Sequence, residues 1–252
     1  MRKLAFIGFL VLLVSCNTDN LGDCFQNDNG EVVRQEFEVA IFKRIIVFDR
    51  VKLYISQGPI QKVVVESPSN LLSEVIVRSE DSILKLKDNN SCNLFRDFET
   101  TKVYVTAPDI DVIRNSSGST VEDIGTISFD RLELVSEDRL LEDEFHVDGD
   151  FDLDELDTNG LVINANGIST FRLKGKTRGF QIGLFDSDAR VEAGELQAKS
   201  INIFHRSTNK IICFPIDSLR GTILGLGDVI AKNRPPFVEV EELFRGRLIF
   251  ED

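Results

Sequence analysis

An alternating run of aspartates is the part of the chain whose residue types best fit ion binding. Residues 137–157 hold 11 carboxylates and one arginine, and among them Asp148, Asp150, Asp152 and Asp154 occupy every second position. Alternate residues of a β-strand point to the same face, so these carboxylates would repel one another there. Calcium, which takes carboxylate oxygens, is therefore the candidate metal. The spacing matches neither an EF-hand nor a glycine-rich nonapeptide repeat, and we favour a solvated acidic strand face without a metal.

Paired carboxylates are also the groups that cleave glycosidic bonds. They do so when they lie about 5–10 Å apart and one of them has a raised pKa. A chain with 42 acidic residues offers such pairs by chance, and it has no tryptophan and only two tyrosines to stack on sugars. The G-x-S-x-G motif of a nucleophilic serine is missing from the sequence. We assign no catalytic residue and interpret the chain as a non-enzyme, with a polysaccharide-binding or polysaccharide-cleaving protein as the alternative.

The histidines do not suggest a cofactor site. The sequence has no C-x-x-C pair, and its two histidines, His146 and His205, lie far apart, so zinc is not expected. His205 precedes Arg206 and Ser207 in a strand-like segment. We interpret it as a residue on the surface of a repeat rather than as a catalytic base.

The first residues resemble the export signal of a bacterial lipoprotein. Two basic residues precede an uninterrupted apolar or glycine run at 4–14, shorter than the roughly 20 residues of a membrane-spanning helix. The run ends in Leu13-Val14-Ser15-Cys16, which resembles a lipobox. The resemblance implies that residues 1–15 are a signal peptide and that Cys16 carries the lipid. An ordinary signal peptide with an incidental cysteine is the alternative.

The anchor and the charge of the chain predict its compartment and exclude some partners. Each buried methylene of an acyl chain contributes about 0.8 kcal/mol, so two or three chains hold a protein firmly on a membrane. Asn17, after the lipidated cysteine, favours the outer membrane of a Gram-negative bacterium. Removal of the signal's two basic residues takes the formal net charge from −13 to −15. Such a surface repels nucleic acid and anionic headgroups, so we expect the lipid to supply the membrane attachment.

The three other cysteines lie in different surroundings. An exported chain meets an oxidising compartment, which permits a disulfide. Cys24 lies near the mature N-terminus and Cys92 in a polar segment, whereas Cys213 lies in an apolar run where a buried free thiol is common. Spacing alone does not select a pair, and we favour a bridge between Cys24 and Cys92.

Most of the remaining chain has the pattern of short strands. Residues 16–34 are polar and predict a tether, so the folded domain is expected to span 35–252. In its first region, 35–108, alternating apolar and polar residues are separated by proline and glycine turn signals. One short helix is predicted at 71–75, capped by Asn70. The predicted strands include 52–55, 62–66, 83–87 and 102–105.

The second region, 109–252, is quasi-periodic. Similar strand starts recur at Leu132, Leu161, Phe180 and Ile201, with spacings of 29, 19 and 21 residues. A period near 20 residues indicates one supersecondary unit per repeat, stacked on its neighbours. We therefore predict an all-β fold of stacked strands that ends in a right-handed β-helix, or β-solenoid. An antiparallel β-sandwich is the alternative, and the repeat boundaries between 132 and 160 stay open.

A series of diffuse motifs follows one order along residues 35–230. They are the segments 48–58, 63–66, 70–72, 84–86, 90–94, 103–105 and 115–119. This order resembles the head GIN domain family of auto-transporter adhesins, common in Bacteroidetes-type bacteria. The resemblance implies two stacked β regions, the later one a right-handed β-solenoid, and it implies no catalytic residue. Members often carry a Gly-Ser or Gly-Ala turn in each repeat; this chain keeps glycine turns at 117–119 and 166–167 but departs from the pattern at 136–138 and 186–188.

No motif in the sequence specifies a ligand. A solenoid presents a long regular face of the kind that binds macromolecules. We therefore predict a non-enzymatic, lipid-anchored cell-envelope protein that acts as an adhesin-like binding module or as a structural support. The expected partners are the membrane, through the lipid, and a glycan or an envelope protein.

Overall fold

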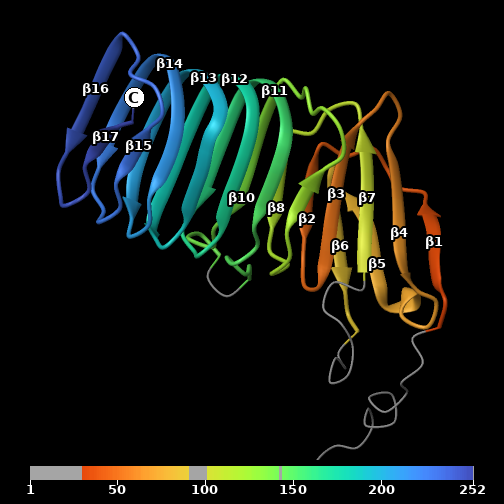
Figure 1. Cartoon of the computed structure of the whole chain (residues 1–252). Coiled ribbons are helices and arrows are strands. Elements are labelled where there is room, and N and C mark those ends of the chain that lie inside the picture. The colour runs from red at the N-terminus through yellow and green to blue at the C-terminus, as the bar shows by residue number, and fades with distance from the viewer. Residues whose placement is uncertain (1–29, 91–100, 142–143, 252) are drawn as a thin grey trace, which may run out of the picture.

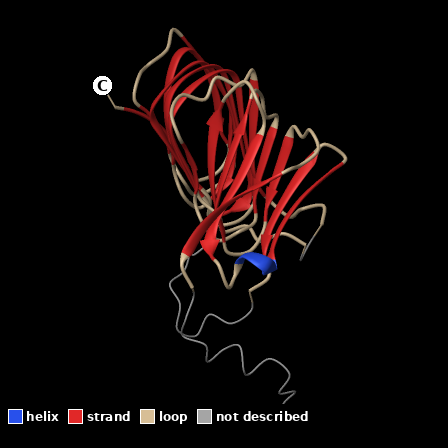
Figure 2. Cartoon of the chain, turned by 90° about the vertical axis from the view of Figure 1, so that its right-hand side faces the viewer, coloured by secondary structure: helices blue, strands red, loops and turns tan. Residues whose placement is uncertain are grey.

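The strands of the protein form one continuous stack. The computed structural model describes residues 30–90, 101–141 and 144–251. A single 17-stranded sheet winds along the molecule, with the N-terminal strands at one end and the C-terminal strands at the other (Figure 1). Seen after a quarter turn, the strands surround a common core (Figure 2). The all-β prediction is therefore confirmed.

The first seven strands make the N-terminal end of the molecule. They are β1 (Val32–Phe37), β2 (Arg44–Val47), β3 (Val51–Gln57), β4 (Lys62–Pro68), β5 (Val75–Glu80), β6 (Ile83–Asp88) and β7 (Thr101–Ala107). Antiparallel pairing occurs here, between β1 and β4, between β4 and β7, and between β5 and β6. The same end also contains the first parallel pairs, β2 with β6 and β3 with β7.

The later strands pair with their neighbours in parallel. They are β8 (Val112–Asn115), β9 (Val121–Asp123), β10 (Arg131–Ser136), β11 (Phe151–Ala165), β12 (Thr170–Ser187), β13 (Arg190–Ser207), β14 (Ile211–Ile223), β15 (Val229–Ala231), β16 (Phe237–Glu242) and β17 (Leu248–Phe250). The four strands β11 to β14 are long because each bends and supplies two sides of one coil of the solenoid.

Two columns of paired strands run the length of the molecule. The first column contains β1, β4, β7, β3 and β9, then the first halves of β11 to β14, and finally β15 and β17. The second contains β5, β6, β2, β8 and β10, then the second halves of β11 to β14, and finally β16. This repeated parallel stacking is that of a β-solenoid, and the antiparallel β-sandwich is excluded.

The register of the second column reproduces the predicted repeat. Leu132 pairs with Leu161, Leu161 with Phe180, and Phe180 with Ile201. These are the positions that gave the spacings of 29, 19 and 21 residues. The first spacing is longer because the connection from β10 to β11 lies between Leu132 and Leu161. This inserted connection explains why the sequence pattern left the repeat boundaries between 132 and 160 open.

Alternation along the strands places the inward residue of each coil in the core. In the second column Leu134, Ile163 and Ile182 are successive register partners and are at most 1% exposed. In the first column Phe151 stacks on Phe171, with ring centroids 5.0 Å apart and planes 8° apart. Such side chains pack closely because neighbouring strands lie about 4.8 Å apart. The core is thus a set of in-register side-chain columns.

A buried asparagine holds the corner between β8 and β9. The Asn115 amide oxygen accepts a hydrogen bond from the Ser117 hydroxyl (2.7 Å), and its amide nitrogen donates to the carbonyl oxygens of Ser119 and Asp150, both at 2.8 Å. Gly118 in this turn has φ of +69°, a conformation that glycine adopts without strain. The Ser117 amide also donates to Asn115, so three polar contacts of this side chain hold the corner and the fourth, to Asp150, joins it to the next coil.

Two local predictions change. β1 starts at Val32 and pairs with β4, so 32–34 belong to the sheet and not to the tether. The helical segment is a 3-10 turn at Leu72–Glu74 whose N-cap is Leu71 rather than Asn70, because only a single turn fits between β4 and β5. β8 and β9 pair with strands on both sides, so the regions on either side of residue 108 form one body.

Candidate functional site

The predicted aspartate row lies only partly on a strand. β11 begins at Phe151, so Asp148 and Asp150 lie in the preceding connection, while Asp152 and Asp154 alternate with buried strand residues. This corrects the expectation of four carboxylates on one strand face. The physical reason is that the connection from β10 joins the parallel ladder only where Phe151 pairs with Val121.

Basic residues of β12 lie opposite these acidic residues. Asp150 accepts a hydrogen bond from the Thr170 amide (2.7 Å) and from the Arg172 guanidinium (3.1 Å), and the Lys174 ammonium lies 2.8 Å from an Asp154 oxygen. Partial burial, and then repulsion by Asp154, raise the pKa of Asp152. The acidic face is therefore part of a surface of alternating charge. Among the residues that the structure describes, no group of three or more His, Cys, Asp or Glu side chains is placed to hold a metal ion.

The cysteines fall into two groups. Cys16, Cys24 and Cys92 lie outside the described residues, so the lipid anchor and the Cys24–Cys92 bridge stay predictions. Cys213 is a fully buried free thiol on β14, which confirms its expected place in the core. Burial raises the pKa of Cys213 to about 12, so the thiol stays protonated and unreactive at neutral pH.

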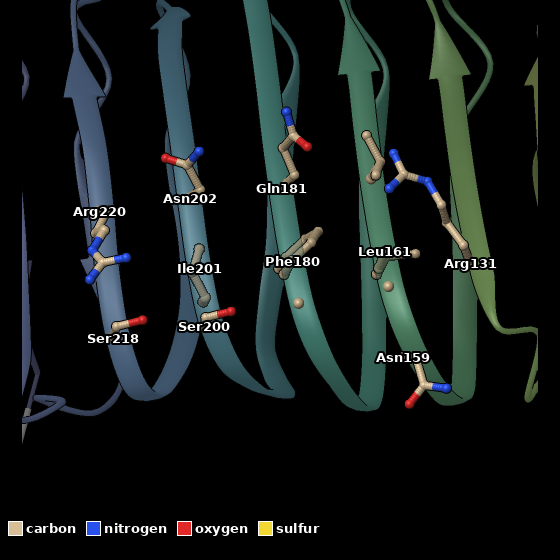
Figure 3. A pocket seen from close by; sticks show the side chains of 13 residues that line it. Arg131, Asn159, Leu161, Phe180, Gln181, Ser200, Ile201, Asn202, Ser218 and Arg220 are labelled. Carbon is tan, nitrogen blue, oxygen red and sulfur yellow. The ribbon is translucent and has the colours of Figure 1, made fainter.

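A groove of about 430 Å³ crosses the outer face of the second column, from β10 to β14 (Figure 3). We call it the amide groove. Its hollow follows the successive register partners Gly160, Gly179, Ser200 and Ser218, whose side chains are absent or small. Its polar side chains include those of Arg131, Asn159, Gln181, Ser200, Asn202 and Arg220.

Two amide side chains form the centre of this groove. Gln181 and Asn202 are direct register partners on β12 and β13, are exposed, and lie side by side (Figure 3). Neither side chain hydrogen-bonds to any residue that the structure describes. Each amide offers two N–H donors and a carbonyl acceptor. The centre of the groove therefore presents donors and acceptors that the fold itself does not use.

An arginine lies at each end of the amide groove (Figure 3). Arg131, on β10, forms no ion pair within the described part of the chain. Arg220, on β14, lies 3.6 Å from Glu239, and its guanidinium lies 4.4 Å from the centre of the Phe237 ring. Four strand spacings separate β10 from β14, which gives the groove a length of about 19 Å. The shape suits an extended ligand rather than a compact one.

Another groove, of about 460 Å³, lies over the first column. Its lining includes Asp154, Arg172, Lys174 and Lys232, which are already joined in ion pairs with neighbouring side chains. A ligand would have to compete with those pairs, whereas the amides of the amide groove have no such partners to lose. We therefore take the amide groove as the candidate site.

The chemistry of the amide groove is that of binding. Its lining residues provide amides, hydroxyls and guanidinium groups but no carboxylate, imidazole or thiol. Such groups form hydrogen bonds, and they do not supply the proton-transferring pair that hydrolysis of a glycosidic bond requires.

The family of the chain follows from its sequence as a whole. A family model described as "Putative auto-transporter adhesin, head GIN domain" matches residues 41–235. The chain belongs to the head GIN domain family. The resemblance of its motif order to that family is thereby confirmed. No curated protein matches the chain.

Solved structures of similar shape support this fold for the head GIN domain. An adhesin-named protein from Bacteroides fragilis has a TM-score of 0.75 and 20% identity, covering 88% of this chain and 97% of that one. One from Parabacteroides merdae has a TM-score of 0.59 and 14% identity, covering 89% and 98%. A protein from Parabacteroides distasonis, named as a lipid-binding protein, has a TM-score of 0.62 and 12% identity, covering 89% and 98%. At these identities the likeness extends to the fold alone.

No helix in the described part of this head GIN domain has the length and apolar character needed to cross a membrane. His146 lies at the surface, with its Nε2 atom 3.1 Å from an Asp49 oxygen.

His205 lies in the core of the head GIN domain, not on the surface of a repeat. It is 0% exposed and stands in register between Leu184 and Ile223. Its Nε2 atom lies 2.9 Å from the carbonyl oxygen of Gly227, and its Nδ1 atom is buried without a hydrogen-bond partner. The surface prediction was wrong because His205 takes the inward position of the strand alternation. Burial lowers the pKa of His205.

This buried imidazole makes the stability of the domain depend on pH. The unfolded chain binds a proton at His205 below about pH 6.5, whereas the folded domain resists protonation, so acidification favours unfolding. We expect the melting temperature to fall as the pH drops below about 6.5, and His205→Leu, which suits a position between Leu184 and Ile223, to remove part of that fall. Thermal melts of both proteins between pH 7.5 and pH 5 check this. Equal slopes for the two proteins would contradict it.

Sequence reasoning missed the residues of the amide groove. Gln181 and Asn202 lie within the strand starts that revealed the repeat, as the outward residues between Phe180 and Ile182 and between Ile201 and Ile203. The available signal was an amide at the same position of two successive repeats. The arginines at the ends, on β10 and β14, have no comparable signal, because they occupy different positions relative to the repeat.

Proposed function

We propose that this head GIN domain is a lipid-anchored, non-enzymatic adhesin-like module of the cell envelope and that the amide groove is its binding surface. The family description and the names of the neighbouring structures support an adhesin-like module at the cell surface or in the envelope. The lipobox-like sequence before Cys16 supports the lipid anchor, and Asn17 supports an outer-membrane location.

One observation carries the assignment of the amide groove. The side chains of Gln181 and Asn202 lie in register on an exposed face and make no hydrogen bond within the described residues. A fold gains nothing from such a pair, because solvated amides contribute little to stability. A ligand that pairs with them gains both specificity and affinity.

Gly179 offers a way to block the groove without disturbing the backbone. A Cβ atom added at Gly179 would meet only the Asn159 carbonyl oxygen, at 3.8 Å, which is ordinary contact. We expect Gly179→Leu to fold like the wild type and to reduce several-fold the retention of cells that carry the protein on surfaces coated with purified mucin. The control Gln197→Leu places the same side chain on another exposed part of β13 and is expected to leave retention unchanged.

Two results would overturn the proposal. Cells with the wild-type protein that are retained no better than cells without it would exclude an adhesin-like role on this surface. Equal retention of Gly179→Leu and wild-type cells would move the binding surface away from the amide groove. Thermal melts of each variant verify that loss of retention does not come from unfolding.

A further inference from the structure

The chemical groups of the amide groove point to a class of ligand. We infer that the amide groove binds an extended, uncharged oligosaccharide that lies across strands β10 to β14. This inference rests on the proposed function, since it names the ligand of the same surface. It is carried by the pairing properties of the polar groups, by the exposed aromatic rings beside them and by the local charge.

The central amides match sugar hydroxyls. A hydroxyl both donates and accepts, and an amide side chain also does both, so one amide can pair with two neighbouring hydroxyls of a sugar ring. Gln181 and Asn202 place two such amides on adjacent strands, about 4.8 Å apart along the groove. The hydroxyls of Ser200 and Ser218 lie along its floor in the next row. Successive sugars of an extended chain could therefore meet successive strands.

Two exposed phenylalanines flank this polar row. Phe204 is 37% exposed and follows Asn202 on the outward side of β13, and Phe237 is 43% exposed and pairs in register with Ser218. Arg220 lies over one face of the Phe237 ring, and Phe204 packs against Phe185. The exposed remainder of each ring is therefore the part that can pack on the C–H face of a sugar while the amides take its hydroxyls. Phe204 and Phe237 take outward positions on their strands.

Apart from Arg131, which forms no ion pair within the described residues, the charge around the groove favours a neutral sugar over an acidic one. Arg220 is already paired with Glu239, and Glu133 occupies the same row as Gln181, one strand beyond Val162. The −13 net charge of the whole chain adds a general repulsion toward polyanions. The arginines then act as planar donors to hydroxyl oxygens at the two ends.

Isothermal titration of the detergent-solubilised full-length protein tests the inference. The probes are hexasaccharides of β-linked glucose, β-linked xylose and α-linked mannose, with a galacturonate hexamer as the acidic comparison. We expect a neutral hexasaccharide to bind more tightly than its disaccharide, because the longer chain crosses more strands. The double variant Gln181→Ala with Asn202→Ala is expected to lose about tenfold to a hundredfold in affinity. Gln197→Ala, an exposed amide elsewhere on β13, is expected to lose nothing.

The possible outcomes distinguish an error in the inferred ligand from an error in the proposed function. Binding of the galacturonate hexamer alone would overturn the neutral class and leave the amide groove in place. Neutral binding that survives both the double variant and Gly179→Leu would overturn the site. A third outcome is that no sugar binds while retention of cells on mucin still depends on Gly179. That outcome would overturn the oligosaccharide as the ligand but not the adhesin-like module, whose ligand would then be a protein. Periodate oxidation of the mucin, which destroys sugar diols, is expected to abolish that retention. Loss of retention after protease treatment of the mucin, but not after periodate, would indicate a protein partner.

Discussion

Replacing Cys16 with alanine is expected to release the protein from membranes. The lipobox-like sequence ends at this cysteine, and the lipid is the attachment that the proposal assigns to the chain. Each acyl chain contributes about 0.8 kcal/mol per buried methylene, so two or three chains make the difference between firm attachment and none. The acidic net charge of −13 offers no electrostatic substitute on anionic headgroups. Fractionation of cells into membrane and soluble fractions measures the effect.

A matched control comes from the next cysteine. Cys24→Ala leaves residues 13–16 unchanged and is expected to stay in the membrane fraction. Because Cys16→Ala can also alter removal of the signal, a second variant replaces residues 1–16 with a cleavable signal peptide that has no cysteine. Persistent membrane attachment of that variant would overturn the anchor.

Phe171→Ala is expected to lower the free energy of unfolding by about 3–5 kcal/mol. Phe171 is fully buried on β12 and lies in register between Phe151 and Val191. The substitution removes its ring from the stack with Phe151, whose centroid is 5.0 Å away, and leaves a cavity between coils that the ladder hydrogen bonds keep apart. In a solenoid, stability depends on contacts between neighbouring coils, so this loss weakens two interfaces at once.

Urea unfolding of the detergent-solubilised protein measures this change. Phe244→Ala is the matched control, because Phe244 is 54% exposed and its truncation is expected to change stability by about 0.5 kcal/mol or less. A loss below about 1 kcal/mol at Phe171 would contradict the in-register aromatic stack between β11 and β12.

The lipid anchor and the binding surface, the two parts of the proposed function, can be tested independently. Release by Cys16→Ala tests the membrane attachment of the domain, whereas Gly179→Leu tests its binding of a ligand. A domain that is anchored but does not increase the retention of cells would instead be a structural support of the envelope. A domain that binds through Gln181 and Asn202 is an adhesin-like module, whichever membrane face carries it.

The sequence by itself determined the class of the fold and its repeat. Leu132, Leu161, Phe180 and Ile201 are register partners in the structure, as their spacing predicted. The physical reason is that alternation and period are local properties: a strand shows its inward face in every second residue, and a stacked coil repeats that face. The turn at 115–119 and the buried thiol of Cys213 were visible in the sequence for the same reason.

Only the tertiary structure decided which residues share a surface. The groove residues Arg131 and Arg220 are 89 positions apart in the chain, and the stacking of β10 to β14 brings them to two ends of one groove. The register between coils also decides several features of single residues. It turns the His205 side chain into the core, and it brings Asp150 and Asp154 to their ion-pair partners on β12. It also places the amide side chains of Gln181 and Asn202 next to each other. A one-residue change of register turns every side chain of a strand to the other face, so composition and spacing alone could not place them.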